Sequence, residues 1–209
     1  MPVPYQLVAA HPVLDFVNTL DNRFVAQGPT ELLGSYEDLL SFVRQSALLD
    51  PRAVPALGRQ ARSSGAAQVL RDARELREAL AATLYGMLGV ARKPTPRVIK
   101  TLERHFLDAA RHQELLWRRP AADSDSISRA TWSWGHFAGR VEMPIWVLAL
   151  SAAGLLTSDA TEHVHLCNSE TCRWLFLDLS KNHSRRWCDM KICGNRMKVR
   201  RYQARHERS

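Results

Sequence analysis

Four cysteines near the C-terminal end constrain this chain more than any other feature. Cys167, Cys172, Cys188 and Cys193 are the only cysteines among 209 residues, and they fall within 27 residues. Four residues separate the members of each pair, and fifteen residues separate the two pairs. Zn²⁺ binds four thiolates in a tetrahedron, and two short turns can each supply two of them. The spacing therefore predicts one structural Zn²⁺, with no coordination position left open for water or a substrate.

Two other arrangements compete with a four-cysteine zinc site. A pair of disulfides would use all four cysteines, but disulfides need an oxidising compartment. His163, His165 and His183 lie close in sequence, and each could replace a cysteine as a ligand. Because four thiolates already complete the coordination shell, we expect these histidines to be ordinary strand or loop residues.

The sequence shows no sign of export or of a membrane span. Residues 1–16 carry no basic flank, no continuous apolar stretch and no small-residue cleavage site, so we predict no signal peptide. The longest apolar run, residues 145–156, has about twelve residues, whereas a membrane span needs roughly twenty. We therefore expect a cytoplasmic protein that does not interact with membranes.

The net charge of +8 lies entirely in the last 37 residues. Residues 173–209 contain 11 Lys/Arg and 3 Asp/Glu, whereas residues 1–172 contain 18 of each kind. A block of positive charge is typical of a surface that contacts nucleic acid or another anionic partner. The alternative is a basic tail that serves only solubility.

Apolar periodicity predicts a fold that is mainly α with minor β structure. The expected helices cover residues 12–20, 35–45, 68–91, 97–118 and 144–156, with a short strand at 131–134. The helix at 144–156 is apolar on nearly every side, which predicts a central buried element. Residues 1–158 would form this helical domain, and residues 159–209 a small treble-clef-like zinc finger.

The predicted finger ends in a basic helix. We expect strands at 163–166 and 174–178, a third segment at 185–188 that pairs back, and a helix from Gly194 to His206. Gly194 would supply a positive φ angle after Cys193. On a helical wheel Cys193 and Met197 face inward, while basic residues occupy both flanks.

Such a helix suits a nucleic-acid groove. Arg and Lys would meet phosphates, and a polar residue such as Asn195 would reach base edges. The predicted DNA-binding residues are Arg185, Arg186, Asn195, Arg196, Lys198, Arg200 and Arg201. The alternative is an adaptor that uses the same basic surface to bind RNA or an acidic protein.

The N-terminal region offers weaker signals for a binding site. His11, Asp15 and Asn18 share one side of a helix, so they could line a ligand pocket; the alternative is that they are caps and satisfied polar groups. A hydrolytic His/Asp pair is a further alternative, but no nucleophile or metal motif accompanies it. Trp132, Trp134, His136 and Trp146 could form an aromatic pocket or belong to the core.

Two motifs resemble a known family. The C-terminal segment contains CGNR at 193–196, preceded by FLDLS and SRRWC and followed by MKVRRY, and it resembles the CGNR zinc finger. The segment HPVLDFVNTL at 11–20 is similar to the N-terminal signature of the ABATE domain, which usually precedes that finger. The resemblance implies the four cysteines as zinc ligands and the basic residues above as the DNA face.

The function that we predict follows from this resemblance together with the charge pattern. Members of the family are regarded as bacterial transcription regulators linked to stress or metabolic control. We expect a non-enzymatic regulator that binds double-stranded DNA, with an N-terminal domain that senses a small-molecule effector or forms a homodimer. The adaptor is the first alternative, and an enzyme with a zinc-stabilised tail is the second.

Overall fold

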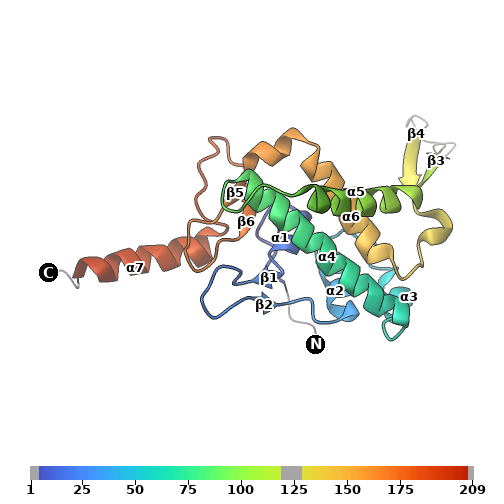
Figure 1. Cartoon of the computed structure of the whole chain (residues 1–209), viewed down its shortest axis with the longest axis horizontal. Helices are drawn as coiled ribbons and strands as arrows, with labels where there is room; N and C mark the ends of the chain where they lie inside the picture. The colour runs from blue at the N-terminus through green and yellow to red at the C-terminus, as the bar shows by residue number, and fades with distance from the viewer. Residues whose placement is uncertain (1–4, 119–128, 207–209) are drawn as a thin grey trace, which may run out of the picture.

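The described part of the chain is mainly helical and contains three small hairpins, which confirms the predicted fold class (Figure 1). A computed structural model describes residues 5–118 and 129–206. The α-helices are α1 (Pro12–Val17), α2 (Tyr36–Gln45), α3 (Val54–Gly58), α4 (Ser64–Met87), α5 (Pro96–Arg111), α6 (Met143–Leu156) and α7 (Asn195–His206). In the described ranges, no helix is both long and apolar enough to cross a membrane.

Six short strands pair into antiparallel hairpins. They are β1 (Leu20–Asp21) with β2 (Thr30–Glu31), β3 (Glu114–Arg118) with β4 (Arg129–Ser133), and β5 (Val164–Leu166) with β6 (Leu175–Leu177). Two 3₁₀ turns, Gly135–Phe137 and Asp159–His163, and a π-helical turn, Met190–Gly194, complete the elements.

Side-chain caps begin helices α2, α4 and α5. Ser35 caps α2 and forms a capping box with Asp38, and the Ser63 side chain caps α4. Thr95 caps α5, and Pro96 occupies its first turn, as the sequence predicts. Each cap satisfies backbone N–H groups that the first turn of a helix leaves unpaired, so local chemistry explains where these helices begin.

Helix α6 is the central element of the core. It contacts α1, α2, α4 and α5, and Leu148 is fully buried (Figure 1). Trp146 is also buried, and it stacks on His112 with ring centroids 3.9 Å apart and on Trp134 at 6.0 Å. Trp134 and Trp146 therefore belong to the core and its edge, whereas Trp132 is exposed.

The helix predicted over 97–118 is confirmed as far as Arg111 and is wrong beyond it. Helix α5 ends at Arg111, and the chain turns into β3, which pairs with β4. The strand predicted at 131–134 is present, but its partner was not predicted, because the apolar run at 115–117 fits either a helix or a strand. The Ser- and Asp-rich sequence at 122–128 predicts a loop, and this segment lies outside the described residues.

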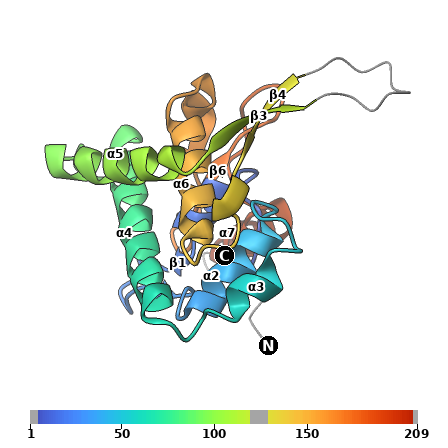
Figure 2. The ribbon, with the colours of Figure 1, turned by 90° about the vertical axis from the view of Figure 1, so that its right-hand side faces the viewer.

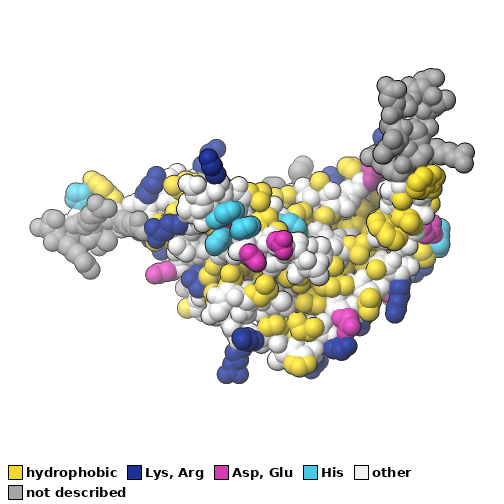
Figure 3. Space-filling view, turned by 90° about the horizontal axis from the view of Figure 1, so that it is seen from above, with side chains coloured by type: hydrophobic (Ala, Val, Ile, Leu, Met, Phe, Trp, Pro, Cys, Tyr) yellow, Lys and Arg dark blue, Asp and Glu magenta, His cyan; other side chains and the backbone are white. Residues whose placement is uncertain are grey.

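The β3–β4 hairpin leaves the body of the protein (Figure 2). Leu115 and Trp132 are cross-strand partners, and they are 61% and 63% exposed. Trp117 lies on the same face and is 67% exposed. Figure 3 shows hydrophobic side chains gathered beside this hairpin.

The zinc-finger region shares one core with the helical domain. Leu175 and Phe176 in β6 are fully buried, and α1 packs against this strand. The backbone N–H of Leu177 donates to the carbonyl of Ala9 over 2.8 Å. The finger is therefore not an independent module. The domain boundary predicted at residue 158 stays a prediction.

Candidate metal centre and nucleic-acid interface

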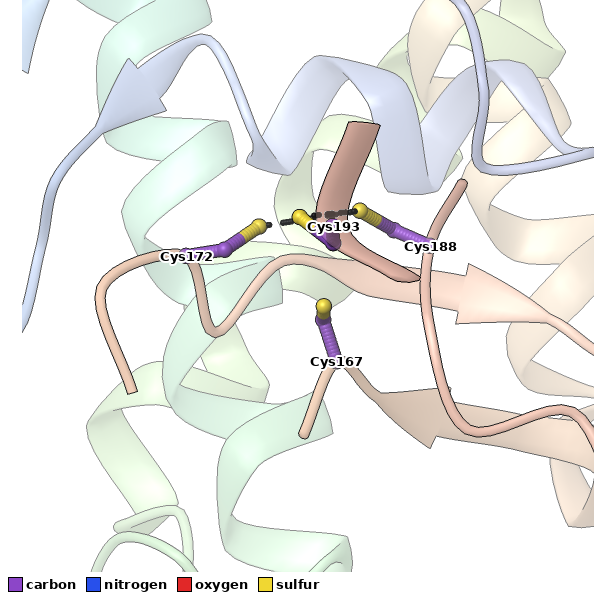
Figure 4. Close-up of side chains that lie close together, drawn as sticks. All are labelled: Cys167, Cys172, Cys188 and Cys193. Atoms are coloured by element: carbon purple, nitrogen blue, oxygen red, sulfur yellow. Dashed lines mark hydrogen bonds between the residues drawn. The ribbon is translucent and has the colours of Figure 1, made fainter. Parts of the chain in front are cut away.

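The four cysteine side chains converge from separate segments (Figure 4). Cys167 follows β5, and Cys172 precedes β6. Cys188 precedes the π-helical turn, and Cys193 lies within it. All four Sγ atoms lie within 4.8 Å of one another, and two of the pairs, Cys172–Cys188 and Cys188–Cys193, are 3.6 Å apart. Zn–S bonds of about 2.3 Å in a tetrahedron place the sulfurs about 3.8 Å apart. The four cysteines thus form a structural zinc site, as the spacing predicts.

The electrostatics of the cluster call for a cation. Hydrogen bonds from the Cys172 and Cys188 thiols lower the pKa of Cys167 to about 2. Interaction with Cys167 raises the pKa of both Cys172 and Cys188, and burial raises that of Cys193. A bound Zn²⁺ would compensate four thiolates and link their deprotonation to folding.

Backbone hydrogen bonds shape the first cysteine turn. The N–H of Cys172 donates to the Ser169 carbonyl over 3.0 Å, and the N–H of Cys167 donates to the Trp174 carbonyl over 2.8 Å. Arg173 completes the turn with a φ of 58°. These bonds connect the first two ligands directly to the start of β6.

The second cysteine turn differs from the prediction in two respects. No strand forms at 185–188, and only one backbone bond, from Asn168 N–H to the Arg186 carbonyl, links this segment to the first turn. Gly194 does not have a positive φ angle. A Cβ there would instead meet Met190 Sδ and the Trp187 ring, so a larger residue would require the exposed Met190 side chain to move.

The nearby histidines take no part in the metal site. Among the described residues, the only cluster of this kind consists of the four cysteines. His163 and His183 stack on each other with ring centroids 3.9 Å apart, and His183 Nδ1 is 3.0 Å from the Asp178 carbonyl. They attach the loop after β6 to the turn before β5.

Helix α7 carries most of the predicted DNA-binding residues and leaves the body of the protein (Figure 1). Four of them are exposed: Asn195, Arg196, Lys198 and Arg200. Lys and Arg side chains also surround this end of the molecule in Figure 3. The backbone of Arg201 lies in α7, but its side chain lies outside the described residues.

Arg185 and Arg186 have different surroundings in the structure. The Arg185 guanidinium donates to the carbonyls of Trp187, Val8 and Cys188, and it lies 4.7 Å from the centroid of the Phe176 ring. Arg186 is exposed on the surface. Arg185 therefore ties the finger to the N-terminal segment, and we leave it out of the proposed DNA interface.

The polar residues of α1 make structural hydrogen bonds. His11 Nδ1 caps the helix by accepting from Val13 N–H, and Asp15 accepts from the backbone N–H groups of Val8 and Ala9. The Asn18 amide accepts from the N–H of Leu175 and donates to its carbonyl, at 3.0 and 2.9 Å. A ligand pocket on these residues stays a prediction.

Two further contacts between the domains were not foreseen from the sequence. The Trp174 indole N–H donates to Asp21 Oδ1 over 2.7 Å, and the Tyr85 hydroxyl donates to the Arg173 carbonyl over 3.2 Å. Both finger residues follow Cys172 directly. Only the tertiary fold brings their partners near, so no local pattern could have indicated them.

Asp15 should make stability depend on pH. Burial raises the pKa of Asp15 from 3.8 to about 6, although the hydrogen bonds from Ala9 and Val8 act in the opposite direction. The folded state then holds a proton that the unfolded chain releases, so wild type loses stability relative to Asp15→Asn as pH rises from about 4 to about 6. We expect Asp15→Asn, whose amide oxygen can keep both hydrogen bonds, to be about 2 kcal/mol more stable at pH 7.

Urea unfolding of both proteins between pH 4 and pH 8 measures this difference. The exposed carboxylate variant Asp50→Asn serves as a control and should show no comparable change. A difference between wild type and Asp15→Asn that stays constant with pH would contradict the prediction.

The fold and the metal site together define a zinc-finger protein in which the finger packs against a helical domain. The CGNR zinc finger family matches residues 163–206. The ABATE family, described as "Putative stress-induced transcription regulator", matches residues 10–159. The chain therefore belongs to the ABATE family and ends in a CGNR zinc finger. The search of curated proteins found no match. Neither of the two matched families is an enzyme family.

Proposed function

We propose that this protein is a non-enzymatic transcription regulator that binds double-stranded DNA through α7. One observation carries the proposal: a helix rich in Lys and Arg projects from a zinc-anchored base with its basic side chains exposed (Figure 1). Gly194 and Cys193 at this base are buried. The zinc site would thus hold a rigid start for a helix whose remaining surface is free to meet DNA.

The dimensions of α7 suit the major groove. A helix with side chains is about 10–12 Å wide, close to the groove width of about 12 Å. Arg196, Lys198 and Arg200 would contact phosphates, and Asn195 would reach base edges near the start of the helix. Arg186 would add a phosphate contact from the loop. We include Arg201 in the DNA interface because it lies in MKVRRY, the segment that follows the CGNR motif.

The other parts of the chain would serve this function indirectly. The four cysteines of the metal site form no disulfide, which is compatible with a reducing cytoplasm, where we expect the protein to act. The helical domain would support the finger and take part in effector response or in a homodimer. A dimer would add the contact area that one short helix lacks for choosing a DNA sequence.

Arg196→Ala should weaken DNA binding and reduce its salt dependence. Removing one phosphate contact is expected to lower the slope of log K against log salt by about one. Fluorescence anisotropy of the zinc-loaded protein with labelled duplex DNA, across a salt series, measures both quantities. Arg59→Ala removes an exposed arginine that is far from α7 in the sequence, and it should leave the slope unchanged.

The same titration can overturn the proposal. If the metal-loaded protein shows no salt-dependent binding to any duplex in a random pool, the regulator function is wrong. Preference for single-stranded RNA, or capture of an acidic protein by the same surface, would point instead to the adaptor.

A further inference from the structure

A cavity lies where the N-terminal segment, the β1–β2 hairpin and the start of α2 meet the zinc finger. It encloses about 440 Å³, within the range of small-molecule sites. We call it the acidic cavity. Its lining residues are Tyr5, Gln6, Asp21, Glu31, Leu32, Gly34, Asp38 and Trp174.

The acidic cavity carries negative charge that nearby cations do not fully balance. No Lys or Arg lines it, although the protein as a whole has a net charge of +8. Glu31 is paired with Arg77 at 2.6 Å and with Arg74 at 3.5 Å, but Asp21 and Asp38 form no ion pair with any residue that the structure describes. Burial raises the pKa of the Tyr5 phenol, and the charges of Asp38 and Glu31 raise it further. The walls therefore favour a cation and disfavour an anion.

Apolar and aromatic groups supply the rest of the wall. The Trp174 indole is held by its hydrogen bond to Asp21, and the Tyr5 hydroxyl, which has one proton to donate, lies 3.1 Å from the carbonyl oxygens of both Leu32 and Asp38. Since these groups are fixed by the fold, the cavity is formed before any ligand enters. Aromatic rings also attract cations through their faces.

We propose that the acidic cavity binds an organic cation: a compact apolar body that carries an ammonium or amidinium group. The charged group would pair with Asp21 and Asp38, and the apolar body would lie against Trp174 and Tyr5. A free metal ion fits less well, because most of the lining surface is apolar and supplies no ligands. Asp38 accepts hydrogen bonds from Ser35 through Oδ2, which leaves Oδ1 for the charged group of the ligand.

An occupant of this cavity would touch the zinc finger directly. The Trp174 carbonyl accepts from the N–H of the zinc ligand Cys167. A smaller neighbouring cavity of about 220 Å³ shares Asp21 and Trp174 and extends to Cys172 and Arg196. If α7 binds DNA as proposed above, ligand binding should change DNA affinity; the cation site itself does not depend on that function.

Benzylamine is a suitable probe, with benzyl alcohol and benzoate as neutral and anionic controls of similar shape. Isothermal titration calorimetry on the zinc-loaded full chain should show benzylamine binding at least about tenfold more tightly than either control. Asp21→Asn, which keeps an acceptor for Trp174, and Asp38→Asn should each weaken it about tenfold, since a hydrogen bond to a charged group contributes roughly that factor. Asp50→Asn, an exposed change outside the cavity, should not.

The variants must first show wild-type zinc content and circular dichroism, so that loss of binding is not loss of fold. Trp174→Phe provides a second route, because it shortens the aromatic wall without changing the charge. Equal affinity for benzylamine and benzyl alcohol, or unchanged binding in both Asp21→Asn and Asp38→Asn, would overturn the proposal. Anisotropy with and without benzylamine at constant ionic strength then tests the coupling alone, and an unchanged DNA affinity would overturn the coupling but not the site.

Discussion

Cys193→Ser should abolish zinc binding under conditions in which the wild-type protein holds one Zn²⁺. Cys193 is 2% exposed and lies two residues before the start of α7, so it joins the basic helix to the other three ligands. A serine oxygen is a poor ligand for zinc in such a site, and apparent zinc-binding free energies of structural sites reach about 10–16 kcal/mol. We expect the zinc affinity to fall by several orders of magnitude, measured by competition with a colorimetric chelator.

The loss of zinc should also destabilise the helical domain. Phe176 and Leu175 of the finger are fully buried in the same core as α1, so a disordered finger would expose both the strand and the surface beneath it. Urea unfolding of the zinc-loaded wild type should show one transition. In Cys193→Ser this transition should move to lower urea concentration. The free energy of unfolding should fall by several kcal/mol, on the order of the contribution from the apolar burial that is lost.

Cys193→His serves as the matched control, because an imidazole nitrogen is a good zinc ligand. It should retain zinc with reduced affinity and restore part of the lost stability. One equivalent of zinc bound with wild-type affinity in Cys193→Ser would contradict the four-cysteine site. Two independent unfolding transitions in wild type would contradict the shared core.

Asn18→Ala should destabilise the protein by about 3–5 kcal/mol. The Asn18 side chain is 4% exposed and forms both hydrogen bonds to the Leu175 backbone across the boundary between the domains. Alanine would leave a buried N–H and a buried carbonyl without partners, at about 1–3 kcal/mol each, and would add a small cavity. Urea unfolding gives the free energy, and the rate of zinc release to a chelator shows whether the finger loosens.

Asn182→Ala is the control for this change, because Asn182 is an exposed residue of the same finger. It should alter stability by less than about 0.5 kcal/mol. If Asn18→Ala behaved like Asn182→Ala in both measurements, the hydrogen bonds between Asn18 and the Leu175 backbone would not hold the finger in place.

The zinc site could be predicted from the sequence because its chemistry is local. Each cysteine pair spans one turn, and turns of that length bring two thiolates together wherever the rest of the chain lies. The starts of α2 and α5 were predictable for the same reason, since Ser35 and Thr95 bond to backbone groups within three residues. The end of α5 was not, because strand pairing with β4 overrides the helical pattern there.

The roles of individual polar residues depend on distant parts of the chain. Arg185 and Arg186 are chemically identical neighbours, yet one is tied to Val8, 177 residues away, and the other faces solvent. The same holds for Asn18, whose side chain bonds the backbone of Leu175, 157 residues away in the sequence.

By itself, the sequence determined the zinc ligands, the basic C-terminal helix and the mainly helical domain, because these follow from residue spacing within a few turns. Only the tertiary structure decided that the finger shares the core of the helical domain, and that Asp21, Asp38 and Trp174 enclose a cavity beside it. Such contacts arise from packing between segments far apart in sequence, where burial and charge depend on partners that no local pattern specifies.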